Sequence, residues 1–312
     1  MGIRGAFTTL RKAFTILNPC DVAPLNIGID MFNIVYTHRA CLDELLELLQ
    51  SWSVSGHRLF CIWDGSAPKE KQEIIGQRRS ARDSAMDTKN DLEKYLDQFR
   101  SQLNDNDIKH LKTAITSLSW QGWHLTGSLK KKIQESLSNA THIHAPTEAD
   151  DLLIQMESNG SLDVIVSLDS DLLAMGSERL WRILRIHKRW VIEDISVENV
   201  CNTFGISLAT LQDICFLAGW DRCHLSGKAY MPFDVAFNRM KHYEILGIVI
   251  EKFIPEADID TDAYERLKQI KKESKERWIA ILKRKNILQT QLKNDTNSLN
   301  TEITDTRNKW SL

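Results

Sequence analysis

The sequence predicts an α/β fold built around a mostly parallel sheet. Three short apolar runs, at 25–30, 57–64 and 162–169, are apolar on both faces, as strands in a covered parallel sheet are. Each run is followed by residues with helical spacing, which is the pattern of strands joined by crossover helices. The 312 residues, 42% of them hydrophobic, suffice for one large domain of this class or two smaller ones.

The helices can be assigned in chain order. Residues 41–52 have the apolar spacing of a crossover helix between the first two strands. The segment 69–103 is helical but has few apolar positions, so we expect it to project from the body or to pack only in part. The later elements are helices at 105–118 and 127–140, a strand at 141–146 that leads into a helix at Glu148, and two helices within 197–220 joined at Gly205.

Composition limits the class of protein. No run approaches the roughly 18–20 apolar residues of a membrane span, and the N-terminus lacks the apolar stretch of a signal peptide. The six cysteines form no CxxC pair, which favours an intracellular protein with reduced thiols. The net charge of −2 does not indicate a nucleic-acid binder by itself, but two bound divalent ions would reverse its sign at the site of contact.

Aspartates end the three predicted strands. Asp30, Asp64 and Asp169 each come at the end of an apolar run, and Asp171 follows two residues after the last. A single aspartate there is explained by a turn or a helix cap. Three in one sheet favour a site, because the carboxyl ends of parallel strands meet at the edge where α/β proteins bind ligands.

A second acidic group lies in "APTEADD", residues 145–151. Thr147 followed three residues later by Asp150 has the spacing of a capping box, and this predicts Thr147 as the N-cap of the next helix. A functional role for Glu148 and Asp150 is favoured because more acids follow, in "SLDSD" and at Asp221 in "LAGWD".

Six blocks now stand in a specific order: "MGI", "IGIDMFNIVY", "WDGSAPKEK…RR", "APTEADD", "SLDSDLLAMG" and "FLAGWD". In this order they resemble the flap endonuclease family of structure-specific 5′-nucleases, of the xeroderma-pigmentosum-G type, over about residues 1–225. The resemblance implies a PIN-like central sheet, a helical arch insertion and a C-terminal helix-turn-helix region.

The resemblance assigns an acidic metal site. Its members in this chain are Asp30, Asp64, Glu148, Asp150, Asp169, Asp171 and Asp221. It implies that Asp30 and Asp221 act through waters and that the other five are direct ligands. Oxygen ligands without His or Cys select Mg²⁺, or Mn²⁺ in its place, and two such ions promote in-line phosphodiester hydrolysis.

The resemblance also assigns residues that hold the substrate. Lys71 and Arg78, seven residues apart and so on one helix face, are expected to contact the scissile phosphate. Tyr36 is expected to stack on a nucleobase, with a core aromatic role as the alternative. Further nucleic-acid contacts are expected from Gly2, Lys69, Arg79 and Arg82.

The chain departs from the family after Asp221. Arg222 replaces a tyrosine, and Met231-Pro232-Phe233 stands where a Gly-Ile-Gly hairpin binds K⁺ and duplex DNA. The helix-turn-helix is therefore expected to be divergent, with a helix restarting after Pro232. No sliding-clamp motif is recognisable. The expected organisation is an N-terminal nuclease region at 1–105, arch and connecting helices at 106–140, an internal nuclease region at 141–257 and a charged helical tail, partly disordered, at 258–312.

The expected function is that of a metal-dependent 5′-nuclease cutting 5′-flap, branched or 5′-ended DNA in replication, repair or recombination. An RNA-cleaving relative of the viral host-shutoff type is an alternative, and so is an inactive scaffold that binds RNA or protein. The retention of all seven acids favours an enzyme. The expected location is the nucleus or, for a viral member, the host cytoplasm or nucleus.

Overall fold

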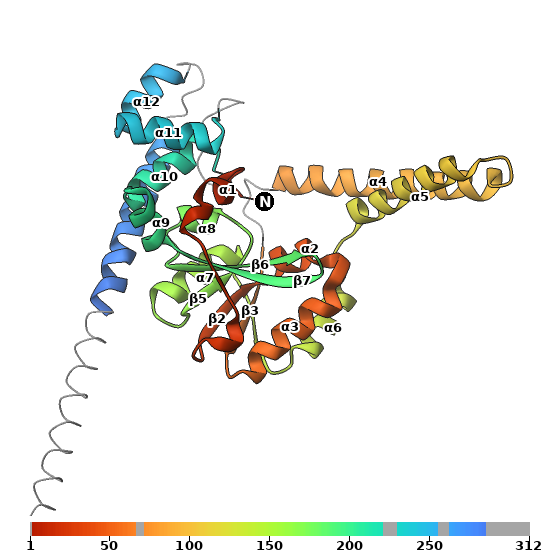
Figure 1. The fold of residues 1–312 in the computed structure, drawn as a ribbon, viewed down its shortest axis with the longest axis horizontal. Coiled ribbons are helices and arrows are strands. Elements are labelled where there is room, and N and C mark those ends of the chain that lie inside the picture. The colour runs from red at the N-terminus through yellow and green to blue at the C-terminus, as the bar shows by residue number, and fades with distance from the viewer. Residues whose placement is uncertain (1, 67–71, 221–229, 255–261, 285–312) are drawn as a thin grey trace, which may run out of the picture.

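The computed structural model describes residues 2–66, 72–220, 230–254 and 262–284, with backbone alone for 72–74. These residues contain a seven-stranded sheet in the order β1-β7-β6-β5-β2-β3-β4, with helices on both faces (Figure 1). The α/β class predicted from the sequence is confirmed.

Five adjacent strands run parallel. They are β6 (Arg179–Ile186), β5 (Val164–Val166), β2 (Asn26–Asp30), β3 (Arg58–Trp63) and β4 (Thr141–His144). The three predicted runs form β2, β3 and β5 in the middle of the sheet, and the predicted fourth strand forms β4 at one edge. The carboxyl ends of β5, β2, β3 and β4 therefore lie side by side.

An antiparallel extension was not predicted. β7 (Arg189–Ser196) pairs with β6, and β1 (Thr15–Leu17) pairs with β7 at the other edge of the sheet. His187 and Lys188 connect β6 to β7 with φ of 47° and 64°. Two left-handed residues are what a tight hairpin turn requires, but neither is the Asn or Gly that usually marks such a turn. The sequence therefore carried no turn signal.

Helices cover the two faces of the sheet and enclose two apolar clusters. One face carries α2 (Met31–Thr37), α3 (Leu42–Val54) and α6 (Gly127–Ser136); the other carries α1 (Ala6–Leu10), α7 (Ala149–Ser158), α8 (Asp171–Ala174), α9 (Val197–Phe204) and α10 (Leu208–Leu217). Short 3₁₀ turns lie at Arg11–Ala13, Pro19–Asp21 and Arg39–Cys41. Trp52 and Trp181 fill the first cluster, while Phe216 and Trp220 fill the second.

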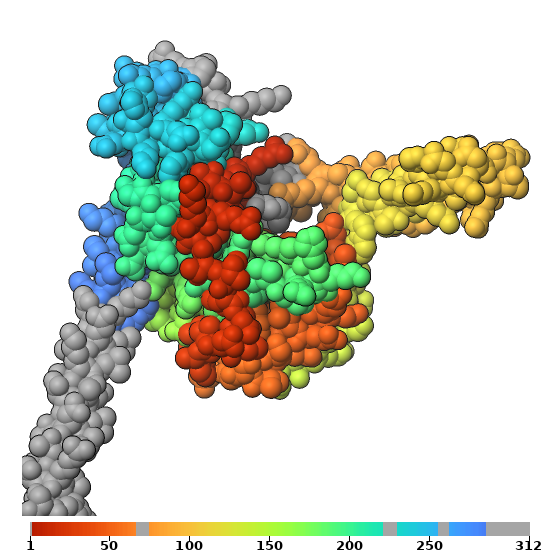
Figure 2. All heavy atoms as spheres, viewed as in Figure 1, coloured from red at the N-terminus to blue at the C-terminus, as the bar shows by residue number. Residues whose placement is uncertain are grey.

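A helical hairpin projects from this body. α4 (Gln72–Phe99) and α5 (Asp105–Gly122) pack against each other and extend away from the sheet, as expected for the polar segment after Pro68 (Figures 1 and 2). The Asn104 side chain caps α5 by accepting a hydrogen bond from the Asp107 backbone N–H at 2.9 Å.

The C-terminal helices close the second face. α11 (Phe233–Tyr243) begins after Pro232, as predicted, packs against α10 and is followed by α12 (Leu246–Phe253). A further helix spans 262–284 and is fixed by polar contacts: Lys271 Nζ lies 2.8 Å from Asp213 Oδ1, and Arg284 donates to the Ser158 carbonyl at 2.9 Å. Burial is the main reason that the pKa of Asp213 is raised, against the lowering effect of Lys271.

In the described part of the chain, no single helix is long and apolar enough to cross a membrane. α9 and α10 reach that length and hydropathy only as a pair, with an 88° bend between them. The left-handed Gly205, with φ of 62°, ends α9 at this bend, which is the junction predicted from the sequence.

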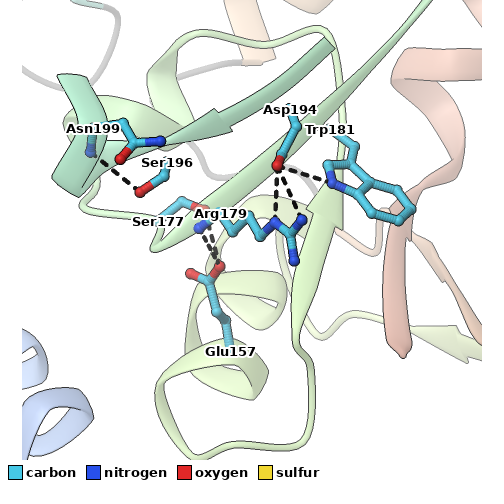
Figure 3. Close-up of polar contacts among 7 residues, drawn as sticks. All are labelled: Glu157, Ser177, Arg179, Trp181, Asp194, Ser196 and Asn199. Atoms are coloured by element: carbon cyan, nitrogen blue, oxygen red, sulfur yellow. Dashed lines mark hydrogen bonds and ion pairs between the residues drawn. The ribbon is translucent and has the colours of Figure 1, made fainter. Parts of the chain in front are cut away.

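The C-terminal end of α7 is fixed by a buried carboxylate. Glu157, 2% exposed, accepts hydrogen bonds from the Ser177 hydroxyl at 3.1 Å and from the Arg179 backbone N–H at 3.0 Å (Figure 3). It accepts a third from the Glu178 backbone N–H at 2.8 Å. The Arg179 side chain in turn pairs with Asp194 on β7. These contacts tie the C-terminal end of α7 to the start of β6 and, through Asp194, to β7.

Candidate functional site

Four neighbouring segments bring carboxylates to one edge of the sheet. Asp30 is the last residue of β2, Asp64 directly follows β3, Glu148 lies between β4 and α7, and Asp169 follows β5. The strand order makes these segments spatial neighbours, although they are far apart in sequence. The topology thus brings together the acids that the sequence analysis had singled out.

Asp30 is the most enclosed of these acids, with 6% of its surface exposed. It caps α2 by accepting a hydrogen bond from the Asn33 backbone N–H at 3.1 Å, and it accepts another from the Ser167 hydroxyl at 3.0 Å. Its pKa is raised to about 7. Burial is the largest cause, and the negative charges of Asp64 and Asp169 contribute to the same shift. The carboxylate is therefore held among like charges.

Asp64 is tied to the start of α7. Its Oδ1 accepts a hydrogen bond from the Ala149 backbone N–H at 2.7 Å, between Glu148 and Asp150. The next residue, Gly65, approaches the same segment so closely that a Cβ there would lie 2.0 Å from the Ala145 carbonyl oxygen. Only glycine fits this approach. It brings the end of β3 against the residues that precede α7.

This contact corrects the predicted capping box. α7 begins at Ala149 with Glu148 at the N-cap position, and no side chain of the cap residue closes the helix. Thr147 is therefore not the N-cap. The reason is physical: Asp64, from the end of β3, already accepts the first backbone N–H of the helix.

Asp169 and Asp171 lie on the turn between β5 and α8. Asp169 Oδ1 accepts a hydrogen bond from the Asp171 backbone N–H at 3.0 Å, and the Asp169 backbone N–H donates to the Ser167 hydroxyl at 3.1 Å. Ser167 thereby joins Asp169 to Asp30. Asp171 is buried, with 6% of its surface exposed, at the first position of α8.

The N-terminal segment packs directly on this turn. The Ile3 backbone N–H donates to the Ser170 hydroxyl at 2.7 Å. A Cβ placed on Gly2 would lie 2.3 Å from Asp169 Oδ1, and its φ of +85° also disfavours other residues. Gly2 thus lies against Asp169, and its contact with nucleic acid stays a prediction.

The donor set fits a hard divalent cation. The six acids that the structure describes offer oxygen atoms, and no His or Cys is among them. A cation between them would offset the repulsion that raises the pKa of Asp30. In the described residues, no three His, Cys, Asp or Glu side chains are grouped as a ready-made metal site. Asp221 lies outside the described residues.

The predicted cations divide into two groups. Lys69 and Lys71 lie outside the described residues. Arg78 is exposed on α4, while Arg79 and Arg82 line a cavity of about 800 Å³ at the base of the helical hairpin. Trp123 lines the same cavity, so an aromatic ring and two guanidinium groups face one space.

Tyr36 is half-buried among aromatic rings. Its ring stacks on Phe32 with a centroid distance of 6.2 Å and meets Trp123 edge-on at 4.9 Å, while its hydroxyl accepts a hydrogen bond from the Leu125 backbone N–H at 3.4 Å. These contacts match the core role that was the alternative interpretation of Tyr36. Base stacking by Tyr36 stays a prediction.

The sequence analysis missed three side chains around the acids. Ser167 bridges Asp30 and Asp169, and Asn33 accepts a hydrogen bond from the Leu168 backbone N–H at 2.8 Å. Lys130 on α6 is close enough to Asp64 for the carboxylate to raise its pKa, although burial has the larger, lowering effect. Asn33 and Ser167 lie within two of the motif blocks but carry no charge, and Lys130 lies in none of them, so only the fold reveals their place beside the acids.

The chain is similar in sequence to known nucleases. Residues 139–221 match the family model of the XPG I-region. Flap endonuclease 1 of Brugia malayi is 24% identical over 192 residues, which cover 61% of this chain and 47% of that protein. The chain thus spans about half the length of the curated relative.

Solved structures share the fold. Flap endonuclease-1 from Methanococcus jannaschii superposes with a TM-score of 0.51 at 19% identity, covering 82% of this chain and 81% of its own. The Holliday junction-resolving enzyme GEN1, in complex with product DNA, Mg²⁺ and Mn²⁺ ions, gives a TM-score of 0.50 at 14% identity, covering 86% of this chain and 55% of its own.

At these identities the superpositions establish the PIN-like nuclease fold alone. The I-region match covers the segment that carries Glu148, Asp150, Asp169, Asp171 and Asp221. Together, the I-region, the distant flap endonuclease relatives and the shared fold confirm the resemblance to the XPG-type flap endonucleases found in the sequence.

Proposed function

We propose that this protein is a metal-dependent, structure-specific 5′-nuclease that hydrolyses phosphodiester bonds in DNA with a 5′ flap or a single-stranded 5′ end. A nuclease of the flap endonuclease type is supported by the I-region and by the relatives. The metal dependence, the flap substrate and the catalytic residues are our proposal.

The observation that carries the proposal is the meeting of carboxylates at one sheet edge. Asp30, Asp64 and Asp169 come from three adjacent strands, and the charges of the latter two raise the pKa of the first. Keeping like charges together in a partly buried place is costly unless a cation is bound. A structural role alone gives no reason for this cost.

The proposed ligands are the acids of the sequence analysis. Asp64, Glu148, Asp150, Asp169 and Asp171 would hold two Mg²⁺ ions, for which Mn²⁺ can substitute, and Asp30 and Asp221 would orient waters. Such ions supply an activated water and stabilise the leaving oxygen of an in-line displacement. The crystallised GEN1 complex contains Mg²⁺ and Mn²⁺, which supports divalent-ion use by this fold.

The remaining residues would position the strand. Lys71 and Arg78 would neutralise the scissile phosphate, while Arg79 and Arg82 would contact the backbone from the cavity at the base of the hairpin. Gly2 gives the N-terminal segment its close approach to Asp169. Phosphate binding by these cations would then be separate from metal binding by the carboxylates at the sheet edge.

The test is cleavage of labelled 5′-flap substrates by protein with an untagged N-terminus. Matched DNA and RNA flaps are incubated with Mg²⁺, with Mn²⁺ and with a chelator. We expect cleavage of the DNA flap near the junction with either ion and none with the chelator. Preferential cleavage of the RNA flap would replace our substrate by the RNA alternative, and no cleavage of either would leave a binding scaffold.

The control variant is Asp169→Asn. Asparagine keeps an oxygen that accepts the 3.0 Å hydrogen bond from the Asp171 backbone N–H, but it removes the negative charge. We expect it to lose more than about 100-fold of the cleavage rate while retaining its thermal stability. Wild-type cleavage by this variant would contradict the metal role of Asp169.

A further inference from the structure

Lys130 lies at the carboxyl ends of β3 and β4, although it belongs to α6. Its Nζ is 4.6 Å from the centre of the Trp63 ring and 5.8 Å from that of Phe32. It is also 3.3 Å from Nδ1 of His144. Trp63 immediately precedes Asp64, and the Asp64 carboxylate is close enough to Lys130 to raise the pKa of its ammonium group.

The pairing of β3 with β4 forms the binding position of the Lys130 ammonium. Trp63 and His144 are directly opposite each other on β3 and β4, so their side chains project from the same face of the sheet. Trp63 is fully buried and is held edge-on by Phe32, with a centroid distance of 5.9 Å. An ammonium over an indole face is held by the electrostatic attraction of the ring. Lys130 is therefore positioned by a rigid scaffold.

This position has an electrostatic consequence at the acidic site. Burial lowers the pKa of Lys130, and the nearby Asp64 carboxylate raises it. A phosphate that approaches the carboxylates is repelled by them, and a fixed cation at their border offsets that repulsion. Lysine suits this task because its ammonium is a compact charge with three donors, so bonding to His144 leaves it able to bind an anion.

We propose that Lys130 binds one backbone phosphate of the nucleic-acid strand that enters the carboxylate site. The inference rests on the nuclease function proposed above and adds a phosphate contact from α6. The cation–π contact with Trp63 keeps the ammonium close to Asp64. There it would contact the nucleic-acid strand next to the reacting phosphate.

α6 offers a matched control in the next residue. The Lys131 side chain is 78% exposed and lies 3.9 Å from Glu135 on its own helix. Lys131→Met removes the same charge from the same helix as Lys130→Met. Methionine keeps an unbranched apolar chain over the Trp63 ring, and Lys130→Arg keeps the charge.

The experiment measures binding of a 5′-flap DNA across a series of salt concentrations, with Ca²⁺ in place of Mg²⁺. We expect Lys130→Met to weaken binding by about tenfold and to reduce the slope of log K against log salt by roughly 0.7–0.9, the value for one lost phosphate contact. Lys130→Arg should retain the slope, and Lys131→Met should match the wild type.

Neutral methylphosphonate linkages, introduced one at a time, locate the contact. One position should weaken wild-type binding and have no effect on Lys130→Met. Thermal unfolding of each variant completes the test. A Lys130→Met protein that melts at a lower temperature but keeps the wild-type salt slope would overturn the proposal, because Lys130 would then only support Trp63.

The outcome for the wild type separates this inference from the proposed function. If the wild type binds and cuts the flap while Lys130→Met is indistinguishable from it, the inference alone fails. If the wild type neither binds nor cuts any flap, the proposed nuclease function is wrong, and so is the proposed Lys130 contact.

Discussion

Two buried carboxylates, near opposite ends of the strands, have different neighbouring groups. Asp30, at the acidic edge, and Glu157, at the far end of α7, both have a pKa raised to about 7, with burial as the largest cause. Glu157 accepts three hydrogen bonds at the start of β6, and Figure 3 shows those from Ser177 and Arg179. The like charge of Glu178 has the smallest effect on its pKa. Asp30 has two donors, and the charges of Asp64 and Asp169 act on it.

The difference shows that burial does not by itself identify a site. The neighbours of Glu157 satisfy its oxygens and connect α7 to β6, so the scaffold gives it a structural role. Asp30 lies near Asp64 and Asp169, whose negative charges raise its pKa, and the cations that we propose would offset this repulsion. The groups that surround a carboxylate with a raised pKa, and not the size of the pKa shift, indicate whether it has a functional role.

The comparison is tested most strongly by neutralising each carboxyl group. Asp30→Asn keeps the oxygen that accepts from the Asn33 backbone N–H, and we expect it to lower the cleavage rate about 10- to 100-fold. Glu157→Gln should cut at close to the wild-type rate and unfold at a lower temperature, because one of its three donors loses its acceptor. Single-turnover cleavage and thermal melts measure both effects.

The opposite results would contradict a structural role for Glu157 and a functional role for Asp30. If Glu157→Gln lost activity at unchanged stability, α7 would transmit a functional role to its far end. If Asp30→Asn kept full activity, its carboxylate would be only a helix cap for α2.

A smaller effect is expected from Gly2→Ala. The new methyl group would lie 2.3 Å from Asp169 Oδ1, so either the N-terminal segment or the carboxylate must move. We expect about a tenfold loss of cleavage, since small displacements of reacting groups are costly. Gly247→Ala, where the added Cβ meets nothing within 4 Å, is the matched control and should cut like the wild type. Equal rates for all three proteins would show that the Gly2 contact does not constrain Asp169.

The smallest expected effect concerns stability and pH. Glu157 has a folded-state pKa of about 7 against an ordinary value of 4.5, so the folded protein keeps this proton longer than the unfolded chain does. As pH rises from about 5 to 7, the unfolded state loses its proton first, and the free energy of unfolding falls, by an amount on the order of 2–3 kcal/mol at most. Above pH 7 this contribution levels off.

Denaturant unfolding at several pH values checks this linkage. The difference in unfolding free energy between wild type and Glu157→Gln should decrease from pH 5 to pH 7. A difference that stays constant over that range would mean that Glu157 ionises normally in the folded protein.

Much of this arrangement was predictable because apolar runs report strands and their ends directly. β2, β3 and β5 were found with their terminal aspartates, and Gly205 marked the bend between α9 and α10. The β6–β7 hairpin was missed because His187 and Lys188 adopt left-handed conformations without the usual turn residues. Local sequence could not report that choice.

Relations between distant segments explain the other misses. Thr147 has a good capping sequence, but Asp64 from β3 takes the helix N–H first. Lys130 looks like one of three successive lysines on a polar helix, and it differs from its neighbours only because Trp63 and His144 are in register across β3 and β4. Such facts depend on the pairing of strands that are far apart in the chain.

If the acids at the sheet edge bind divalent cations together, a Mn²⁺ titration will detect that binding without any cleavage assay. Electron paramagnetic resonance counts free and bound Mn²⁺ for the wild type, Asp169→Asn and Glu157→Gln. The account predicts two bound ions for the wild type and Glu157→Gln, and affinity at least about tenfold weaker for Asp169→Asn. Equal Mn²⁺ binding by all three proteins, or none by the wild type, would contradict it.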